Sequence, residues 1–513
     1  MRRLILCGVM VLAAGLWKTA WSQTQAPDQD TPVGRPAANL IPAPYDLEDG
    51  YLKWRLLPSE QKYAAIDGKH LNEYVKQFMD ISFRYRDQGH QWWGRIMGTS
   101  GDADNAQWLA EKFKQVGLQD VKNVPIDLPP QWHANTFGID ATGSGKTLHL
   151  ESAWPALYSP ATPADGLDLE AVYAGFGTEA DYHRADVRGK AVVIFSVPLP
   201  SQIHSSAAME GTVERAAAKG AAAVIEAVML PGNIQTQLHQ ARPSVPVLLT
   251  IGMLDGYKLR DMIGRSPADQ PVHLKIRLDA GMVPNLKTSI AFGTLPGSTD
   301  EKIYILAHRD GWFAAGEDNA SGVATVLGLA EYFARIPQAN RRRTIIFMGT
   351  PGHHDLNGHP WGATYLVEHK ELLTKTAFVM NSEHTASIGF HVLGENILRT
   401  NESDASSWSI NGSDRLRDII IKSLRDFGVA TYAQPYGNAP GEISPLYDGW
   451  PAFQLMNFEG PYFHSSGDDS VPSNGLENAT RAYAHIIDEV NGVDLKDLQP
   501  SHTRAPAGPG AAN

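Results

Sequence analysis

Histidine and carboxylate side chains stand at the ends of four short apolar stretches in the second half of the chain. In chain order, these ends carry His308, then His353 and His354, then Glu383 and His384, and finally His464. The loop behind His308 adds Asp310 and Asp318. Imidazole and carboxylate groups that converge on one point are the ligands of zinc and related metals. A lone histidine at a strand end is usually structural, but four such ends together predict a metal site.

The four stretches are short and apolar enough to be buried strands, at residues 303–308, 344–350, 377–383 and 451–460. Helical patterns lie among them at residues 320–335, 361–373 and 413–427. Strands that alternate with helices predict an α/β fold with a mostly parallel, helix-covered sheet. The carboxyl ends of parallel strands meet at one edge, so these polar side chains would converge there. The alternative is that Asp318 only caps the following helix and His308 only fills a loop.

The other regions of the chain carry no comparable cluster of side chains. Upstream, helices are predicted at residues 69–86 and up to Val116, followed by an extended segment at 121–139. Between residues 148 and 263, short apolar strands alternate with helical segments, which predicts a separate small α/β domain. Since that stretch has no cluster of His, Asp and Glu, we expect it to cover or shape the site. A last helix is predicted at residues 474–490.

Composition and the two termini restrict the classes of function. The net charge of −12 and the lack of a basic stripe argue against nucleic acid as a partner. Residues 1–22 have the charged start, short apolar core and small residues of a secretory signal peptide, with an uncleaved anchor as the alternative. The protein is therefore expected to be secreted or periplasmic, with no membrane contact after cleavage. Residues 23–45 and 498–513 are predicted to be a flexible lead-in and a disordered tail.

Several motifs resemble one known family. HRDGWFAAGEDNASG is similar to the first metal motif of the co-catalytic zinc exopeptidases, which include secreted aminopeptidases, glutamate carboxypeptidase II and the transferrin receptor. DVRGKAVVIF, ERAAAKGAAAVIEAV and SVPVLLTIG resemble the protease-associated domain that many members carry inserted in the catalytic domain. The resemblance implies a zinc aminopeptidase-like catalytic domain in two parts, 46–140 and 285–497, around an inserted protease-associated domain at 141–284.

The resemblance also implies a set of metal ligands. Two metal ions would be bridged by Asp318, the first also held by His308 and Glu383, the second by His354 and His464. Asp310 would hydrogen-bond the far nitrogen of His308 and fix its tautomer. Zinc suits such ligands, as two ions per chain or as one, while manganese, cobalt or iron remain alternatives.

This chain departs from the family after the second strand. Where the family has two adjacent glutamates, a general base and a metal ligand, this chain has His353 and His354. His354 can replace a carboxylate as ligand, and His353 could serve as the base, since an imidazole ordinarily titrates near neutral pH. The exchange removes two formal negative charges. Phe463 stands where peptidases such as glutamate carboxypeptidase II have a tyrosine, and Tyr462 or His359 are candidate substitutes for it.

Two functions follow from these residues and the resemblance. The first is an exported metal-dependent hydrolase, foremost an exopeptidase, that cleaves a peptide or N-acyl amino acid with a metal-activated water. Its catalytic residues would be His353 and Asp310, and its partner a peptide or small amide substrate. The second is a catalytically degenerate binding or scaffold protein on the same fold, because a fold does not settle function. Retained ligands favour the first function, and the lost glutamates favour the second.

Overall fold

The computed structural model describes residues 53–197, 211–237, 246–354, 362–393, 396–432, 442–457, 460 and 462–500. The predicted signal peptide, the predicted lead-in, His359 and the tail from residue 501 lie outside the described residues. Within the described part of the chain, no helix has the length and apolar character needed to cross a membrane.

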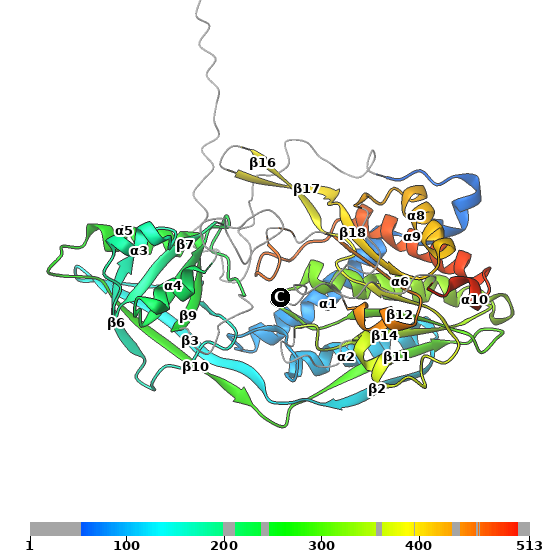
Figure 1. The fold of residues 1–513 in the computed structure, drawn as a ribbon, viewed down its shortest axis with the longest axis horizontal. Helices are drawn as coiled ribbons and strands as arrows, with labels where there is room; N and C mark the ends of the chain where they lie inside the picture. The colour runs from blue at the N-terminus through cyan, green and yellow to red at the C-terminus, as the bar shows by residue number, and fades with distance from the viewer. Residues whose placement is uncertain are drawn as a thin grey trace, which may run out of the picture.

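Two eight-stranded sheets dominate the described residues and lie in separate halves of the molecule (Figure 1). The first sheet has the order β19-β18-β20-β15-β12-β14-β11-β2. Its strands in chain order are β2 (Gln119–Asp127), β11 (Lys287–Leu295), β12 (Lys302–His308), β14 (Thr344–Thr350), β15 (Thr376–Ser382), β18 (Ser406–Asn411), β19 (Thr431–Tyr432) and β20 (Ala452–Asn457). Two small pairs complete the strands outside the second sheet, β1 (Gly94–Arg95) with β13 (Gly311–Trp312) and β16 (Ile388–Leu393) with β17 (Asn396–Ser403).

The centre of the first sheet is parallel, as the sequence predicts. β12 pairs in parallel with β14 and with β15, and β15 pairs in parallel with β20. These are the four predicted strands, and they are adjacent. Towards the edges, β11 and β18 pair antiparallel with their central neighbours, so the whole sheet is mixed. The predicted α/β fold is confirmed, with antiparallel strands flanking the parallel centre.

Helices cover both faces of this sheet. The larger core contains β12 residues Ile303 and Ile305 together with residues of α1, α6, α8 and α9, whereas Tyr304 and Leu306 belong to a second core with residues of α7 and η4. Burial of both faces explains why β12 is continuously apolar. The helices and helical turns of this half are η1 (Pro58–Ala65), α1 (Gly68–Asp87), α2 (Ser100–Val116), η2 (Gly316–Ala320), α6 (Ser321–Ala334), η3 (Gln338–Asn340), α7 (Gly362–Glu368), α8 (Asp414–Asp426), η4 (Ser444–Asp448), α9 (Ser473–Asn491) and α10 (Leu495–Leu498).

The second sheet has the order β4-β3-β10-β6-β7-β8-β9-β5 and forms the other half together with α3, α4 and α5. Its elements are β3 (Gln131–Gly143), β4 (Lys146–His149), β5 (Trp154–Pro155), β6 (Leu167–Tyr173), α3 (Glu179–Arg184), β7 (Ala191–Ser196), α4 (Thr212–Ala218), β8 (Ala223–Val228), β9 (Val247–Gly252), α5 (Met253–Arg265) and β10 (His273–Val283). The long antiparallel strands β3 and β10 extend from this sheet towards the other half (Figure 1). β3 starts at Gln131, before the predicted boundary at 141, and β10 ends at Val283, beside the predicted boundary at 284.

Candidate metal centre

The parallel register brings the predicted site residues to one edge of the first sheet. His308 is the last residue of β12 and pairs with Thr350, the last residue of β14. His353 and His354 follow Thr350 in the next turn, and Glu383 follows the end of β15 directly. The structure therefore brings the side chains of the first three strand ends together, and the loop behind β20 adds His464.

Asp318 reaches this edge through a loop that buried groups hold in place. The guanidinium of Arg95 is fully buried and donates to the backbone carbonyls of Arg309, Ala314 and Ala315 at 3.0, 2.7 and 3.0 Å. Asp468 accepts from the backbone N–H groups of Glu317 and Asp318, at 2.7 and 3.2 Å. At the start of α6, the side chain of Asn319 and not that of Asp318 accepts from a backbone N–H, that of Gly322 at 2.9 Å, so the alternative of Asp318 as a helix cap does not hold.

The start of α6 is fixed against the end of β15 by a second set of contacts. Asn319 donates from its side chain to the carbonyl of Ser382 at 2.8 Å and accepts from the backbone N–H of His384 at 3.2 Å. Gly322 lies so close that an added Cβ would stand 2.2 Å from the Ser382 carbonyl oxygen. Only glycine fits this approach, which keeps Asp318 and Glu383 in contact with the same histidines.

The two carboxylate oxygens of Asp318 face two different sets of imidazoles. Oδ1 lies 2.9 Å from His308 Nε2 and 3.2 Å from His384 Nε2. Oδ2 lies 2.9 Å from His354 Nε2 and 2.8 Å from His464 Nε2. The sequence predicts Asp318 as a bridge between two metal ions, and this arrangement has the form that such a bridge requires.

The donor set fits divalent transition metals. Four buried ligand atoms converge without making a geometrically satisfactory hydrogen bond, namely His308 Nε2, Asp318 Oδ1, Glu383 Oε1 and His384 Nε2. Glu383 Oε1 lies 3.3 Å from His308 Nε2 and 3.5 Å from His384 Nε2. Buried polar atoms without partners are costly, so their proximity indicates a place that a cation would fill. We name the set facing Asp318 Oδ1 the first centre, and Asp318 Oδ2 with His354 and His464 the second centre.

The buried carboxylates and imidazoles of the two centres shift each other's pKa values. Burial opposes ionisation of Asp318, but His354, His308 and His384 outweigh it and hold the pKa of this carboxyl well below its ordinary value. Burial likewise opposes the charged form of His354, but Asp318 and Asp310 outweigh it and raise the pKa of His354 to about 9. Without metal, the imidazoles thus hold protons against the carboxylates, and metal binding must release those protons.

Asp310 lies behind both centres. The sequence predicts that its carboxylate bonds the far nitrogen of His308, but His308 Nδ1 is closer to the Asp310 backbone carbonyl, at 3.1 Å, than to Oδ1, at 3.5 Å. The carboxylate is closer to His354, where Oδ2 lies 3.1 Å from Nδ1 and accepts from the backbone N–H at 3.0 Å. It therefore orients His354 more directly than His308.

His353 lies beside the first centre and has a carboxylate behind it. Its ring stacks on His308 with centroids 4.1 Å apart, and its Nε2 is 3.7 Å from Glu383 Oε1. Its Nδ1 is 2.7 Å from Glu442 Oε1, and Asn381 donates to the other oxygen of Glu442. Burial raises the pKa of Glu442, with the charge of Glu383 adding to it. Sequence reasoning assigns Glu442 no role, because it lies in a loop far along the chain with no motif around it.

The remaining candidates have structural contacts. The Tyr462 hydroxyl donates to the backbone carbonyl of Pro231 at 3.4 Å. The Phe463 ring stacks on His464 with centroids 3.6 Å apart, and its edge meets His384. His384 is named by its position after the third strand, but the family motif gives it no ligand role, and its place in the first centre comes from the structure alone.

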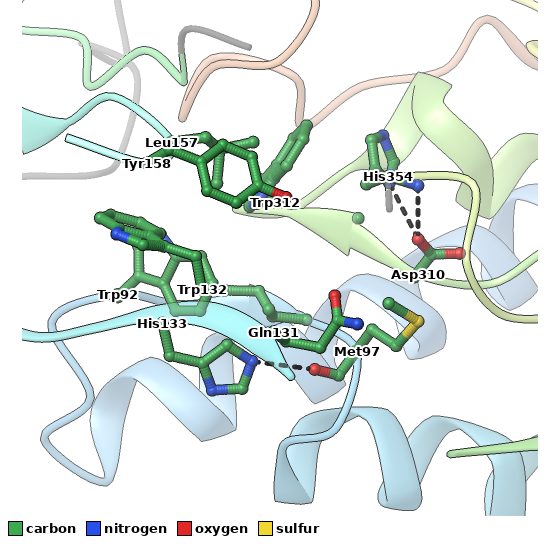
Figure 2. Close-up of a pocket in the computed structure, with 12 residues that line it drawn as sticks. Trp92, Met97, Gln131, Trp132, His133, Leu157, Tyr158, Asp310, Trp312 and His354 are labelled. Atoms are coloured by element: carbon green, nitrogen blue, oxygen red, sulfur yellow. Dashed lines mark hydrogen bonds and ion pairs between the residues drawn. The ribbon is translucent and has the colours of Figure 1, made fainter. Parts of the chain in front are cut away.

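A pocket opens beside the second centre. Asp310 and His354 form one side of it, and the aromatic rings of Trp92, Trp132 and Tyr158 line the other (Figure 2). Trp312 also lines the pocket, with its ring centroid 4.3 Å from that of His354. Trp132 and Tyr158 belong to the half with the second sheet, so this half shapes the site, as predicted. Among the described lining residues there is no lysine or arginine.

Comparisons with known proteins agree with this geometry. Residues 291–426 match the sequence model of Peptidase family M28. The fold is similar to that of BSAP, a zinc aminopeptidase from Bacillus subtilis, with 18% identity and a TM-score of 0.58 over 86% of this chain and 99% of that chain. It is also similar to a peptidase M28 precursor from Shewanella amazonensis, with 20% identity and a TM-score of 0.61 over the same shares.

A third solved structure, an aminopeptidase from an Aneurinibacillus strain, has 16% identity and a TM-score of 0.50 over 86% of this chain and 96% of that chain. No curated protein matches the sequence significantly. The predicted resemblance of the catalytic part to zinc exopeptidases is thereby confirmed, whereas the inserted protease-associated domain stays a prediction. Residues 291–426 are thus similar in sequence to Peptidase family M28, and the fold is similar to that of the zinc aminopeptidases.

Proposed function

We propose that this chain is an exported exopeptidase that uses two zinc ions bridged by Asp318 to cleave the amide bond beside an apolar terminal residue. One observation carries the proposal. The two oxygens of Asp318 face separate imidazole sets, His308 with His384 and His354 with His464, at 2.8 to 3.2 Å. Metal ions held there would polarise the scissile carbonyl and lower the pKa of a water molecule.

His353 is the group we assign to proton transfer. With Nδ1–H donating to Glu442 at 2.7 Å, its Nε2 keeps a lone pair that can accept a proton. Its side chain retains 22% exposure, whereas that of His384 retains 3%, so His353 is the more accessible to a substrate. It would take a proton from the attacking water and deliver it to the leaving amine. Asp310 would act by orienting His354 rather than by contacting the substrate.

The pocket of Figure 2 supports an apolar substrate residue. Its aromatic lining from Trp92, Trp132 and Tyr158 offers apolar surface, while its described lining residues offer no cation for a substrate carboxylate. This favours removal of an apolar amino-terminal residue over carboxypeptidase action. A small N-acyl amino acid with an aromatic group would contact the same apolar surface.

Export and the identity of the smaller half are part of the proposal. The composition of residues 1–22 supports a cleaved signal peptide, which would place the protein outside the cytoplasm. The order β6-β7-β8-β9 with helices around it supports a protease-associated domain. The net charge of −12 supports peptides or small amides, rather than nucleic acid, as partners.

The test uses the mature chain, purified and loaded with zinc. Peptides and aminoacyl amides with Leu, Phe or Lys at the amino terminus, and N-acyl amino acids, would be assayed with and without a chelator. We expect chelator-sensitive release of Leu and Phe, and no turnover in Asp318→Asn. The control is Asp168→Asn, which changes an exposed aspartate on β6 and is expected to match wild type.

Two results would contradict the proposal. A wild-type chain that binds no zinc and turns over none of these substrates would favour the alternative of a binding or scaffold protein. Turnover that resists chelation, or that survives in Asp318→Asn, would show that the bridging carboxylate is not needed.

A further inference from the structure

His384 is a buried histidine whose ring nitrogens lack ordinary partners. It follows Glu383 directly, and its residue is 2% exposed. Neither Nδ1 nor Nε2 makes a hydrogen bond to any described residue within the accepted geometry. Its Nε2 instead faces the carboxylate oxygens of Asp318 and Glu383 at 3.2 and 3.5 Å, an arrangement that is unfavourable for a buried imidazole unless a proton or a cation lies between these atoms. The burial of these two ring nitrogens is therefore not explained by packing alone.

The backbone, and not the ring, fixes the position of His384. Its φ of 38° lies in the left-handed region, which non-glycine residues seldom adopt. Its N–H donates to Asn319 at 3.2 Å, and its carbonyl accepts from Asn457 at 3.0 Å. These contacts hold the ring towards the first centre, and the centroid of the Phe463 ring lies 5.1 Å from that of His384. Left-handed residues held by surrounding structure are common at functional sites.

The separations between ligand atoms are near those of a tetrahedral metal site, with two inside the expected range and two shorter than it. Zinc–nitrogen and zinc–oxygen bonds of about 2.0–2.2 Å in tetrahedral geometry give ligand separations of about 3.3–3.6 Å. His384 Nε2 lies 3.2 Å from Asp318 Oδ1 and 3.5 Å from Glu383 Oε1. His308 Nε2 lies 2.9 and 3.3 Å from the same two oxygens. The two imidazoles therefore face the same pair of carboxylate oxygens.

His353 is the competing candidate for this position, since one of its ligand atoms lies within 4.8 Å of those of His308, Asp318 and Glu383. Its Nε2 is 3.7 Å from Glu383 Oε1, a longer separation than either contact of His384. It is also the more exposed of the two rings. We propose that His384 is a metal ligand and supplies the fourth protein group of the first centre, beside His308, Asp318 and Glu383. This inference rests on the proposed function, because it requires that the centre holds a metal.

A fourth protein ligand would make the first centre a closed, structural site and leave catalysis to the second centre. Sites with four protein ligands are closed and usually structural, whereas catalytic sites keep one position open. The second centre has three protein ligands, Asp318, His354 and His464, and so retains the open position. With His384 completing the first centre, His353 keeps the proton-transfer role assigned to it above.

The test compares His384→Gln, His353→Gln and wild type in the full mature chain. Metal-free proteins, checked for folding by circular dichroism, would be titrated with zinc against a chromophoric chelator, and bound zinc would be counted by mass spectrometry. His485→Gln is the control, since His485 bonds Ser423 and belongs to neither centre. We expect two zinc ions in wild type, His485→Gln and His353→Gln. In His384→Gln, one of the two should bind more weakly by over about 10-fold, because even an indirect ligand contact contributes that much.

Each other outcome overturns the inference. If wild type binds two zinc ions and His384→Gln binds them equally well, His384 is not a ligand, although the proposed function stands. Zinc lost from His353→Gln but kept by His384→Gln would assign the position to His353. A wild type that binds no zinc overturns both proposals. If His384→Gln does not fold, the crystal structure of the zinc-loaded wild type decides, with His384 Nε2 expected at about 2.0–2.1 Å from zinc.

Discussion

Replacing Asp310 by asparagine tests how the second centre is built. The carboxylate accepts on both oxygens, from the ring and backbone of His354 on Oδ2 at 3.1 and 3.0 Å, and from the backbone of His353 on Oδ1 at 3.4 Å. Oδ1 is also 3.5 Å from His308 Nδ1. Asparagine has one accepting oxygen, and its NH₂ group can only donate. In either orientation of the amide, a donor therefore faces a donor.

The expected loss of metal affinity follows from the tautomer that His354 must adopt in Asp310→Asn. If the NH₂ group faces His354, Nδ1 must carry a lone pair, and the proton moves to Nε2, the atom that would bind metal. If the amide is reversed, the ring contact survives but the conflict falls on His353 and His308, whose contacts are longer. Loss of such a partner behind a ligand typically lowers metal affinity by about 10- to 100-fold, or about 1.4–2.7 kcal/mol. We expect Asp310→Asn to lie in that range.

Zinc titration of the metal-free protein against a chromophoric chelator measures this loss. Asp279→Asn, an exposed change on β10, controls for the removal of one negative charge. The thermal midpoint with excess zinc should also fall, since ligand stabilisation follows affinity. A zinc affinity for Asp310→Asn within about twofold of wild type, which is under about 0.5 kcal/mol, would refute this account of the second centre.

Three further predictions follow from the buried charges. Glu442→Gln should lower turnover by up to about 100-fold at full zinc occupancy, because His353 loses the carboxylate that sets its proton-accepting nitrogen. Steady-state kinetics with a zinc count separates this effect from loss of metal. In the metal-free protein, burial lowers the pKa of His384 but nearby carboxylates outweigh it and raise the pKa to about 10. Its contribution to stability should be complete below the ordinary histidine pKa of about 6.5 and be lost as the pH rises towards 10, so melting with chelator should show a falling midpoint. Arg309→Met leaves the carboxylate of Asp102 buried without its charged partner and should destabilise the fold by about 3–5 kcal/mol in urea unfolding.

Much of the fold could be predicted because the spacing of apolar residues along the chain shows which faces of strands and helices are buried. The four apolar stretches become β12, β14, β15 and β20, and they are adjacent and parallel as predicted. Strands buried on both faces have continuous apolar sequences, which make them easy to find. The antiparallel flanks were harder to predict, since strands such as β2 have half-exposed, polar sequences whose partners lie far along the chain.

The candidate site was predictable where ligands sit at strand ends. His308, Asp318, His354, Glu383 and His464 were named from the sequence, and the structure brings them together. Glu442 could not be found, because its role depends on a loop meeting His353 from 89 positions away. The role of His384 depends on its left-handed backbone, which the sequence alone does not indicate.

The histidine pair after β14 places an imidazole in front of each of two buried carboxylates. Sequence comparison with the family suggests the loss of two formal charges at His353 and His354. In the structure each imidazole is backed by a buried carboxylate, Glu442 at 2.7 Å from His353 and Asp310 at 3.1 Å from His354. A carboxylate behind an imidazole fixes its tautomer and raises its basicity towards a metal or a proton. The charge of Glu442 can thus act through the His353 ring, where a family member would present a carboxylate directly. The replacement of the glutamate by His353 is therefore compatible with hydrolysis, because the imidazole and the carboxylate behind it act as one unit.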